Sequence, residues 1–139
     1  MKDLLNTISS IKDKLASLKD RPKLLLADDE PTYRTMLEDH FKKLKYEVDV
    51  CGDGRSALDH LFKNTYDLIW LDLKMPMVDG MDVIRTMRSG GIKTPVVMVT
   101  GYADPETTQA AITAGAQAVI SKPHGFDELM DILANFKLQ

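Results

Sequence analysis

Five polar side chains in this sequence follow the ends of short apolar runs. Asp28 and Asp29 follow one run, Asp72 follows a second, Thr100 ends a third, and Lys122 comes shortly after a fourth. Three carboxylates gathered in one place disfavour each other's ionisation, so a divalent cation is expected to balance them. Oxygen ligands of this kind suit Mg²⁺, which keeps several waters and leaves coordination positions for a phosphoryl oxygen. The set therefore predicts a phosphoryl-transfer site.

Asp72 is the preferred nucleophile within this set, because Asp28 and Asp29 are adjacent and better placed to hold a metal. Lys122 would add a fixed positive charge and Thr100 a hydroxyl donor, both suited to the oxygens of a transferring phosphoryl group. Taken singly, each residue has an ordinary alternative role in a solvated turn, at a strand end or as a surface charge. Their joint position at four strand ends favours the chemical interpretation.

The elements that would position these side chains alternate between strands and helices from residue 23 onward. Strands are expected at 23–27, 67–71, 95–100 and 117–120, while the alternation over 47–51 is typical of an edge strand. Helices are expected over 31–44, 55–62, 81–88, 104–115 and 126–136, with Ala57, Leu58, Leu61 and Phe62 inward on the second. Five such units predict a parallel sheet with helices on both faces. Ligands bind beyond the carboxyl ends of such strands, where the five polar residues fall.

The first 21 residues form a separate predicted segment. Apolar residues recur there at spacings of four and three, which indicates an amphipathic helix: Leu4, Ile8, Ile11, Leu15 and Leu18. A parallel homodimer through this helix would set Lys14 against Lys19 across the pair, which weakens the coiled-coil interpretation. A helix packed on its own domain or on another protein remains the alternative. The expected organisation is therefore a helix at 1–21 and one domain at 22–139.

Composition narrows the class of protein. With 139 residues, 44% of them hydrophobic, the chain is long enough for one domain and too short for two. A net charge of -3 argues against a nucleic-acid-binding surface. The single cysteine, Cys51, fits a reducing compartment, and neither a signal peptide nor an apolar stretch long enough to cross a bilayer is apparent. We therefore expect a cytoplasmic protein.

Four segments of the chain resemble the receiver domain of two-component response regulators, the CheY-like family. They are LADDE at 26–30, LDLKMP at 71–76 with Asp79-Gly80 after it, MVTG at 98–101 and SKP at 121–123. The resemblance covers residue 22 to the C-terminus. It implies a flavodoxin-like (βα)5 doubly wound parallel sheet with strand order 2-1-3-4-5, and a role in signalling.

The resemblance also implies a role for each acidic residue. Asp72 would accept a phosphoryl group from a phosphohistidine on a sensor histidine kinase or a phosphotransfer protein. Asp29 and Asp72 would bind Mg²⁺ directly, together with the main-chain carbonyl of Lys74, and Asp28 would act through a bound water. The domain would then be a signalling switch that catalyses its own phosphorylation and dephosphorylation, and not an enzyme with a separate substrate.

Other residues would report the phosphorylated state, again by resemblance. Lys122 would pair with Asp72 or its phosphate, Thr100 would turn inward to hydrogen-bond the phosphoryl group, and the Lys122–Pro123 bond would be cis. The switch position three residues before the lysine, often aromatic in this family, is Val119 here. The expected output surface combines the helix over 104–115, the strand over 117–120 and the helix over 126–136, and it would bind a downstream protein.

Three other interpretations have sequence support. Residues 52–57, GDGRSA, match a dinucleotide-binding fingerprint, but that motif needs a buried central strand and the strand before it alternates like an edge. A Mg²⁺-dependent phosphohydrolase of the haloacid dehalogenase type shares the Asp nucleophile, but it normally needs a second Asp where this chain has Lys74. A structural interaction module built on the N-terminal helix is the third alternative.

Overall fold

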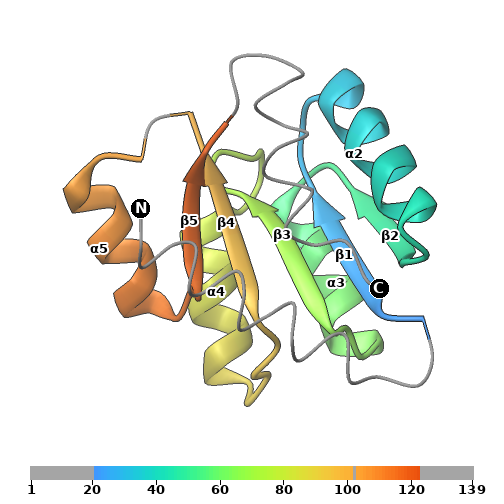
Figure 1. The fold of residues 1–139 in the computed structure, drawn as a ribbon. Coiled ribbons are helices and arrows are strands. Elements are labelled where there is room, and N and C mark those ends of the chain that lie inside the picture. The colour runs from blue at the N-terminus through green and yellow to red at the C-terminus, as the bar shows by residue number, and fades with distance from the viewer. Residues whose placement is uncertain (1–20, 102, 123–139) are drawn as a thin grey trace.

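The computed structural model describes residues 21–101 and 103–122. The predicted helices over 1–21 and 126–136 lie outside the described residues, apart from Arg21, as do Tyr102 and the Lys122–Pro123 bond. Within the described ranges, no helix is long and apolar enough to span a membrane. The described part contains the sheet and four helices, which are sufficient to position the predicted site (Figure 1).

A five-stranded parallel sheet forms the centre of the molecule. Its strands are β1 (Lys23–Ala27), β2 (Glu47–Cys51), β3 (Leu68–Asp72), β4 (Val96–Thr100) and β5 (Ala118–Ser121). The order β2-β1-β3-β4-β5 confirms the predicted topology, including the edge position of β2. Strands β3 and β4 are buried along their whole length, whereas β2 is buried only at Cys51. This difference explains the continuous apolar runs of the inner strands and the alternation of β2.

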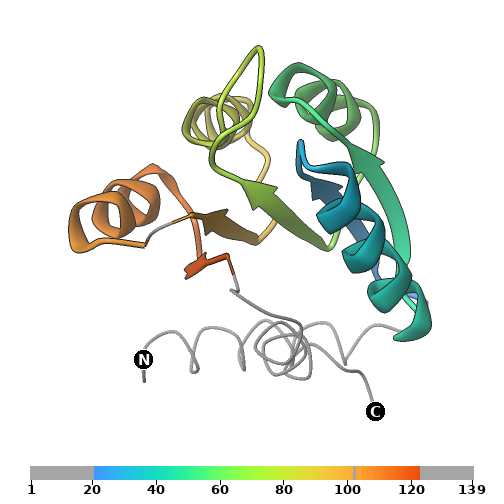
Figure 2. The same cartoon turned by 90° about the horizontal axis from the view of Figure 1, so that it is seen from above.

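Four described helices cover the two faces of the sheet. They are α2 (Pro31–Lys43), α3 (Gly54–Lys63), α4 (Gly80–Ser89) and α5 (Pro105–Ala114). Figure 2 shows α2 on one face and α3, α4 and α5 on the other. The core divides accordingly: Leu24 and Leu26 of β1 pack with Phe41 of α2, and Leu25 packs with Ile84 of α4 on the opposite face. The alternation of side chains along β1 thus builds both halves of the core.

Aspartate caps set the start of three helices. The Asp53 side chain accepts a hydrogen bond from the Ser56 N–H at 2.7 Å. In the same way, Asp79 accepts one from the Asp82 N–H and Asp104 accepts one from the Thr107 N–H. Such caps satisfy backbone donors that have no partner within the helix. The predicted starts of α3 and α4 were one residue late because these caps bring Gly54 and Gly80 into the first turn. The predicted cap at Asp104 and the end of α5 at Gly115 are confirmed.

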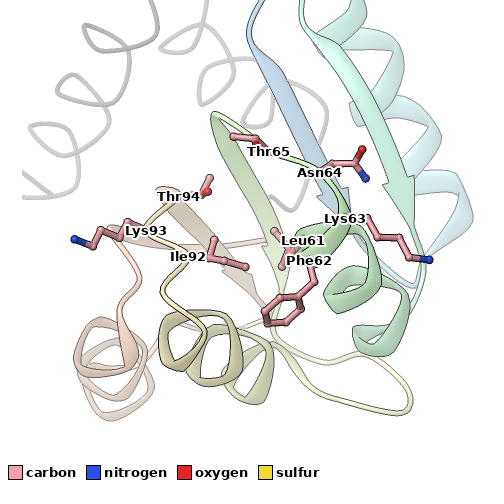
Figure 3. A pocket seen from close by; sticks show the side chains of 8 residues that line it. All are labelled: Leu61, Phe62, Lys63, Asn64, Thr65, Ile92, Lys93 and Thr94. Carbon is pink, nitrogen blue, oxygen red and sulfur yellow. The ribbon is translucent and has the colours of Figure 1, made fainter.

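The predicted inward position of Phe62 was wrong. Leu61 and Ala57 of α3 are buried, but Phe62 is 55% exposed, because the buried stripe of this helix is narrow and Phe62 lies at its margin in the last turn. Its ring packs beside Gly90, where an added Cβ would lie 2.7 Å from Phe62 Cε1. Figure 3 shows Phe62 at the edge of a cavity of about 350 Å³ at the amino ends of β3 and β4. This cavity contains none of the predicted site residues.

The Arg88 side chain ties the end of α4 to the amino ends of β4 and β5. Its Nη1 donates to the Ile92 carbonyl at 2.9 Å, and its Nη2 donates to the Gly115 carbonyl at 2.7 Å. Gln117, predicted as the first residue of the last strand, instead precedes β5, and its Oε1 accepts a hydrogen bond from the Val96 N–H at 2.6 Å. These bonds satisfy main-chain groups at the edge of the sheet opposite the predicted site.

Candidate functional site

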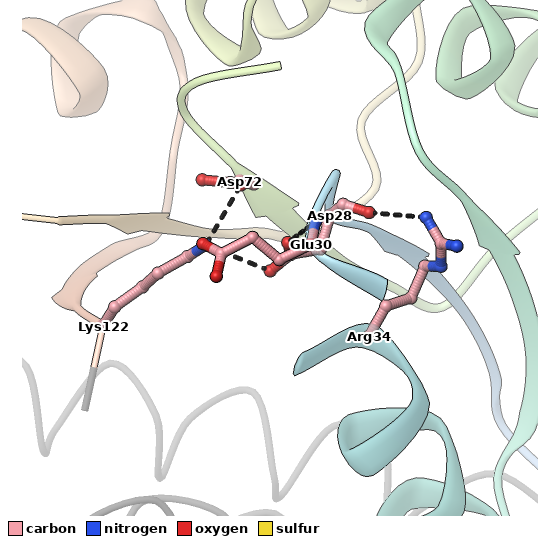
Figure 4. A network of polar contacts seen from close by, with 5 residues as sticks. All are labelled: Asp28, Glu30, Arg34, Asp72 and Lys122. Carbon is pink, nitrogen blue, oxygen red and sulfur yellow. Dashed lines mark hydrogen bonds and ion pairs between the residues drawn. The ribbon is translucent and has the colours of Figure 1, made fainter. Parts of the chain in front are cut away.

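The carboxyl ends of four strands bring the predicted residues together, as Figure 4 shows for several of them. Asp28 follows β1 directly, Asp72 ends β3, Thr100 ends β4 and Lys122 follows β5. Asp28, Asp29 and Asp72 each offer a carboxylate oxygen, and these oxygens all lie within 4.8 Å of one another. The predicted convergence of three carboxylates is therefore present in the structure.

The three carboxylates differ in their exposure to solvent. Asp28 and Asp72 are only 1% and 3% exposed, whereas Asp29 is exposed. The Asp28 side chain accepts a hydrogen bond from the Glu30 N–H at 2.8 Å, and the Asp28 carbonyl accepts one from Arg34 Nη1 at 3.0 Å. These bonds hold the turn after β1, which places a buried carboxylate and an exposed carboxylate side by side in the cluster.

Lys122 extends its ammonium group into this cluster. Its Nζ lies 3.3 Å from Asp72 Oδ2 and 3.5 Å from Asp28 Oδ2, and it also hydrogen-bonds the Glu30 carboxylate. The Lys122 backbone N–H donates to the Thr100 carbonyl at 2.6 Å, which ties the ends of β4 and β5 together. One cation therefore serves two buried carboxylates and one exposed carboxylate.

This arrangement shifts the pKa of both buried acids and of the lysine. Burial, and then the charge of Asp28, raise the pKa of Asp72 to about 7, although Lys122 opposes the shift. Burial also raises the pKa of Asp28. Burial of the Lys122 ammonium would lower its pKa, but the bond to Glu30 and the charges of Asp28 and Asp72 outweigh burial and raise it. The site in this form carries more negative than positive charge.

The donor set fits a hard divalent cation. Three carboxylates with oxygens within 4.8 Å of one another provide the ligand type that Mg²⁺ prefers, and the exposed Asp29 leaves one side open to water. The pKa of Asp72 is raised first by burial and then by the charge of Asp28, and Lys122 offsets only part of this rise. A second positive charge would restore the balance.

Three further predicted residues occupy different surroundings. Thr100 is buried at the end of β4, beside the strand that carries Asp72. Val119 is also buried and pairs with Met98 in the β4–β5 register, so no aromatic side chain is available at this position. Lys74 lies exposed after β3, and the role of its carbonyl as a metal ligand stays a prediction.

Sequence reasoning missed the contribution of the first turn of α2. Glu30 immediately precedes this helix and bonds Lys122, while the Lys122 ammonium lies 5.2 Å from the centre of the Tyr33 ring. The double aspartate followed by Glu and Pro marks a helix start at the carboxyl end of a strand. That signal identifies Glu30 as a rim residue, but its bond to a lysine 92 positions later cannot be obtained from it.

The loop after Asp72 is held against the start of α3. The Gly54 N–H donates to the Pro76 carbonyl at 3.3 Å, and a Cβ at Gly54 would overlap the Val78 carbonyl. Gly80 closes the loop by donating to the Leu73 carbonyl at 2.7 Å. The glycine at position 54 therefore allows the loop that carries Lys74 to approach the helix closely.

A Gly54→Ala substitution should lower the free energy of unfolding by about 1 to 3 kcal/mol, because the added methyl group must displace the backbone of the loop at Val78. Helix propensity alone would favour alanine here. Urea titration measures the change in the free energy of unfolding. Gly101→Ala is the control, because an added Cβ there meets nothing within 4 Å. An unchanged midpoint for Gly54→Ala would show that the approach is not tight.

Comparison with known proteins gives a consistent result. Residues 24–134 match the family model of the response regulator receiver domain. The chain is 38% identical over 108 residues to the regulatory protein AtoC of Escherichia coli, covering 77% of this chain and 23% of AtoC. It spans less than half the length of several curated relatives that it matches. The activities of those longer proteins therefore do not transfer to it directly.

Solved structures agree with the sequence comparison. The chemotaxis response regulator CheY4 of Vibrio cholerae superposes with a TM-score of 0.75 at 30% identity, covering 84% of this chain and 98% of CheY4. The receiver domain of the sensor histidine kinase PA1611 from Pseudomonas aeruginosa gives a TM-score of 0.71 at 28% identity, covering 84% and 97%. That domain has a magnesium ion coordinated in its active site cleft. With its fold, its cluster of strand-end carboxylates and these matches, the chain belongs to the family of response regulator receiver domains.

Proposed function

We propose that Asp72 is the phosphoacceptor of this receiver domain and takes a phosphoryl group from a phosphohistidine on a sensor histidine kinase or a phosphotransfer protein. The observation that carries this proposal is the Asp72 carboxylate at the carboxyl end of β3, beside Asp28 and 3.3 Å from the Lys122 ammonium. In the transfer, the phosphorus–nitrogen bond of phosphohistidine breaks and a bond from phosphorus to an Asp72 oxygen forms. The leaving imidazole nitrogen keeps the electron pair and takes a proton from solvent.

Asp72 must be ionised to act as the nucleophile. Its pKa of about 7 leaves the acid partly protonated at neutral pH, and a positive charge beside it favours the carboxylate. Lys122 supplies one such charge and remains close enough to meet an oxygen of the transferred group. Phosphoryl transfer requires mainly this positioning and charge neutralisation, which the rim of the sheet provides.

A Mg²⁺ ion would be held by Asp29 and Asp72 directly, by the main-chain carbonyl of Lys74, and by Asp28 through a water molecule. When bound, it would neutralise charge on the phosphoryl oxygens. Two observations support this assignment. Carboxylate oxygens of Asp28, Asp29 and Asp72 lie close together, and the receiver domain of PA1611 has a magnesium ion in its active site cleft.

Thr100 and Lys122 would report the phosphorylated state to the surface of α5, β5 and the predicted helix over 126–136. Driving a two-state domain from 1:99 to 99:1 needs about 5.5 kcal/mol. One hydrogen bond from Thr100 to a charged acceptor contributes about 1.5 to 3 kcal/mol, so Lys122 must supply part of the remainder. The buried Val119 provides no aromatic side chain for this switch. Gln109 and Gln117 are exposed on the proposed surface, which would bind a downstream protein.

Asp72→Asn should abolish phosphoryl uptake. Mass spectrometry after incubation with Mg²⁺ and phosphoramidate should find one phosphoryl group on the wild-type chain and none on this variant. Asp39→Asn, which changes an exposed aspartate on α2, should be phosphorylated like the wild type. A wild-type chain that stays unmodified would overturn the proposal. Continuous release of phosphate from a general phosphomonoester would instead support the rival phosphohydrolase.

A further inference from the structure

The first turn of α2 holds the lysine of the site from the solvent side. Of the three carboxylates around Lys122 Nζ, the one nearest to it belongs to Glu30, and the Tyr33 ring lies on the same helix, 5.2 Å from Nζ. The Glu30 backbone N–H is itself bonded to Asp28, so its position is tied to the acidic cluster. Glu30 is thus built into the site but lies at its outer edge (Figure 4).

The ammonium group of Lys122 has three hydrogens and faces three carboxylates. Glu30, Asp72 and Asp28 each lie within ion-pair distance of it. Phosphorylation removes the charge of the Asp72 carboxylate, and one phosphoryl oxygen can take its place at the ammonium. A second phosphoryl oxygen that pairs with this ammonium must take the place of Asp28 or Glu30.

Solvent exposure decides which carboxylate gives way. The Asp28 side chain is 1% exposed and would be left buried and charged without its cation, which is costly. The Glu30 side chain is 59% exposed, so water can replace the ammonium at small cost. The Lys122 ammonium lies at the end of a flexible four-carbon side chain, so it can turn inward without a change in the backbone.

We propose that Glu30 is a positioning residue that occupies the solvent side of the Lys122 ammonium in the unphosphorylated domain and releases it to the phosphoryl group. This inference rests on the proposed function of Asp72. The Glu30–Lys122 contact stabilises the unphosphorylated state only, so it opposes phosphorylation. Because Glu30 at the cap of α2 and Tyr33 in its first turn both lie against Lys122, the exchange also loosens the start of α2 from the residue that follows β5.

Shortening the side chain separates direct contact from simple charge. Glu30→Gln removes the charge, and Glu30→Asp keeps the charge but withdraws the carboxylate by one methylene group. If contact matters, both variants should release Lys122. If only the electric field of Glu30 matters, Glu30→Asp should behave as the wild type. Glu38→Gln is the matched control, since Glu38 lies on the same helix and pairs with Lys42 at 2.8 Å, away from the site.

The experiment measures affinity for beryllofluoride, a phosphoryl mimic, in the presence of Mg²⁺, with fluorine NMR to detect the bound form. Glu30→Gln and Glu30→Asp should each bind about three- to tenfold more tightly than the wild type, the range expected for losing one partly exposed ion pair. Glu38→Gln should match the wild type. The difference between Glu30→Gln and the wild type should also shrink in 1 M salt, where the Debye length is about 3 Å.

Each alternative result has a defined meaning. Wild-type affinity in both Glu30 variants overturns the role of Glu30 and leaves the phosphoacceptor proposal intact. Tighter binding by Glu30→Gln alone overturns the contact mechanism. A wild-type chain that binds no beryllofluoride and takes no phosphoryl group from phosphoramidate overturns the proposed function, and with it this inference.

Discussion

An Asp72→Asn chain in metal-free buffer at pH 8 should have a free energy of unfolding about 2 to 4 kcal/mol higher than that of the wild type. Burial and the charge of Asp28 raise the pKa of Asp72 from 3.8 to about 7 in the folded domain. Each pKa unit corresponds to about 1.4 kcal/mol, and the lower end of the range allows for relaxation around the coupled carboxylates. Asparagine keeps the shape of the side chain without the charge.

The size of this effect grows with pH in a defined way. Well below pH 3.8, Asp72 is protonated in the folded and unfolded states, so it makes no contribution to the pH dependence. Between pH 4 and pH 7 the unfolded chain releases a proton that the folded domain retains, and the stability of the wild type falls. Above pH 7 the full loss is present. The maximum difference between the wild type and Asp72→Asn is therefore expected at pH 8.

Urea titrations from pH 4 to pH 8 in the presence of a chelator test this prediction. The wild type should lose stability over this range, Asp72→Asn should lose less, and Asp39→Asn should follow the wild type. Added Mg²⁺ should stabilise the wild type more than Asp72→Asn, since a ligand that binds only the folded state raises its stability. Parallel pH profiles for the wild type and Asp72→Asn would refute the assignment of an uncompensated charge to Asp72.

A Lys122→Met chain should show the opposite change, with a free energy of unfolding at pH 7 lower by about 3 kcal/mol. Removal of the ammonium leaves two buried carboxylates, Asp28 and Asp72, without their cation, which is the costly way to break a buried ion pair. The pKa of Lys122 is raised in the folded state, so its stabilising contribution is complete at neutral pH and is lost only at strongly alkaline pH.

The same substitution should increase the affinity for Mg²⁺, because the ammonium and the metal ion compete for the same carboxylates. Calorimetric titration of Mg²⁺ into the metal-free chain measures this change, and urea titration at pH 7 measures stability. Lys93→Met removes an exposed lysine at the other end of the sheet and serves as the control for loss of one positive charge. Equal Mg²⁺ affinity in Lys122→Met and the wild type would show that Lys122 does not occupy the metal-binding region.

Most of the fold was predictable because the inner strands are continuous apolar runs, whereas polar and apolar residues alternate in the edge strand. Residues 68–72 are apolar until their last position because both faces of β3 are covered. Residues 47–51 alternate between polar and apolar because β2 lies at the edge of the sheet, where it is less buried. Parallel strands place their carboxyl ends at one edge of the sheet, so order along the chain sufficed to group Asp28, Asp72, Thr100 and Lys122.

Side-chain geometry was less predictable than the arrangement of the strands. Phe62 matched the apolar spacing of α3 but lies at the margin of a narrow buried stripe, which depends on how α3 meets α4. Glu30 could be placed at a helix start, but whether its carboxylate meets Lys122 depends on the lengths and rotamers of two long side chains. Such contacts follow from three-dimensional packing and leave no periodic signal.

The Arg88 guanidinium has a mechanical consequence for the sheet. It anchors the amino ends of β4 and β5 to α4 through the Ile92 and Gly115 carbonyls, whereas their opposite ends carry Thr100 and Lys122. Between its two ends β4 is paired with β3 on one side and β5 on the other, up to Thr100 beside Ser121. A shift that begins at Thr100 should therefore pass sideways to the neighbouring strand ends, while the anchored amino ends stay in place.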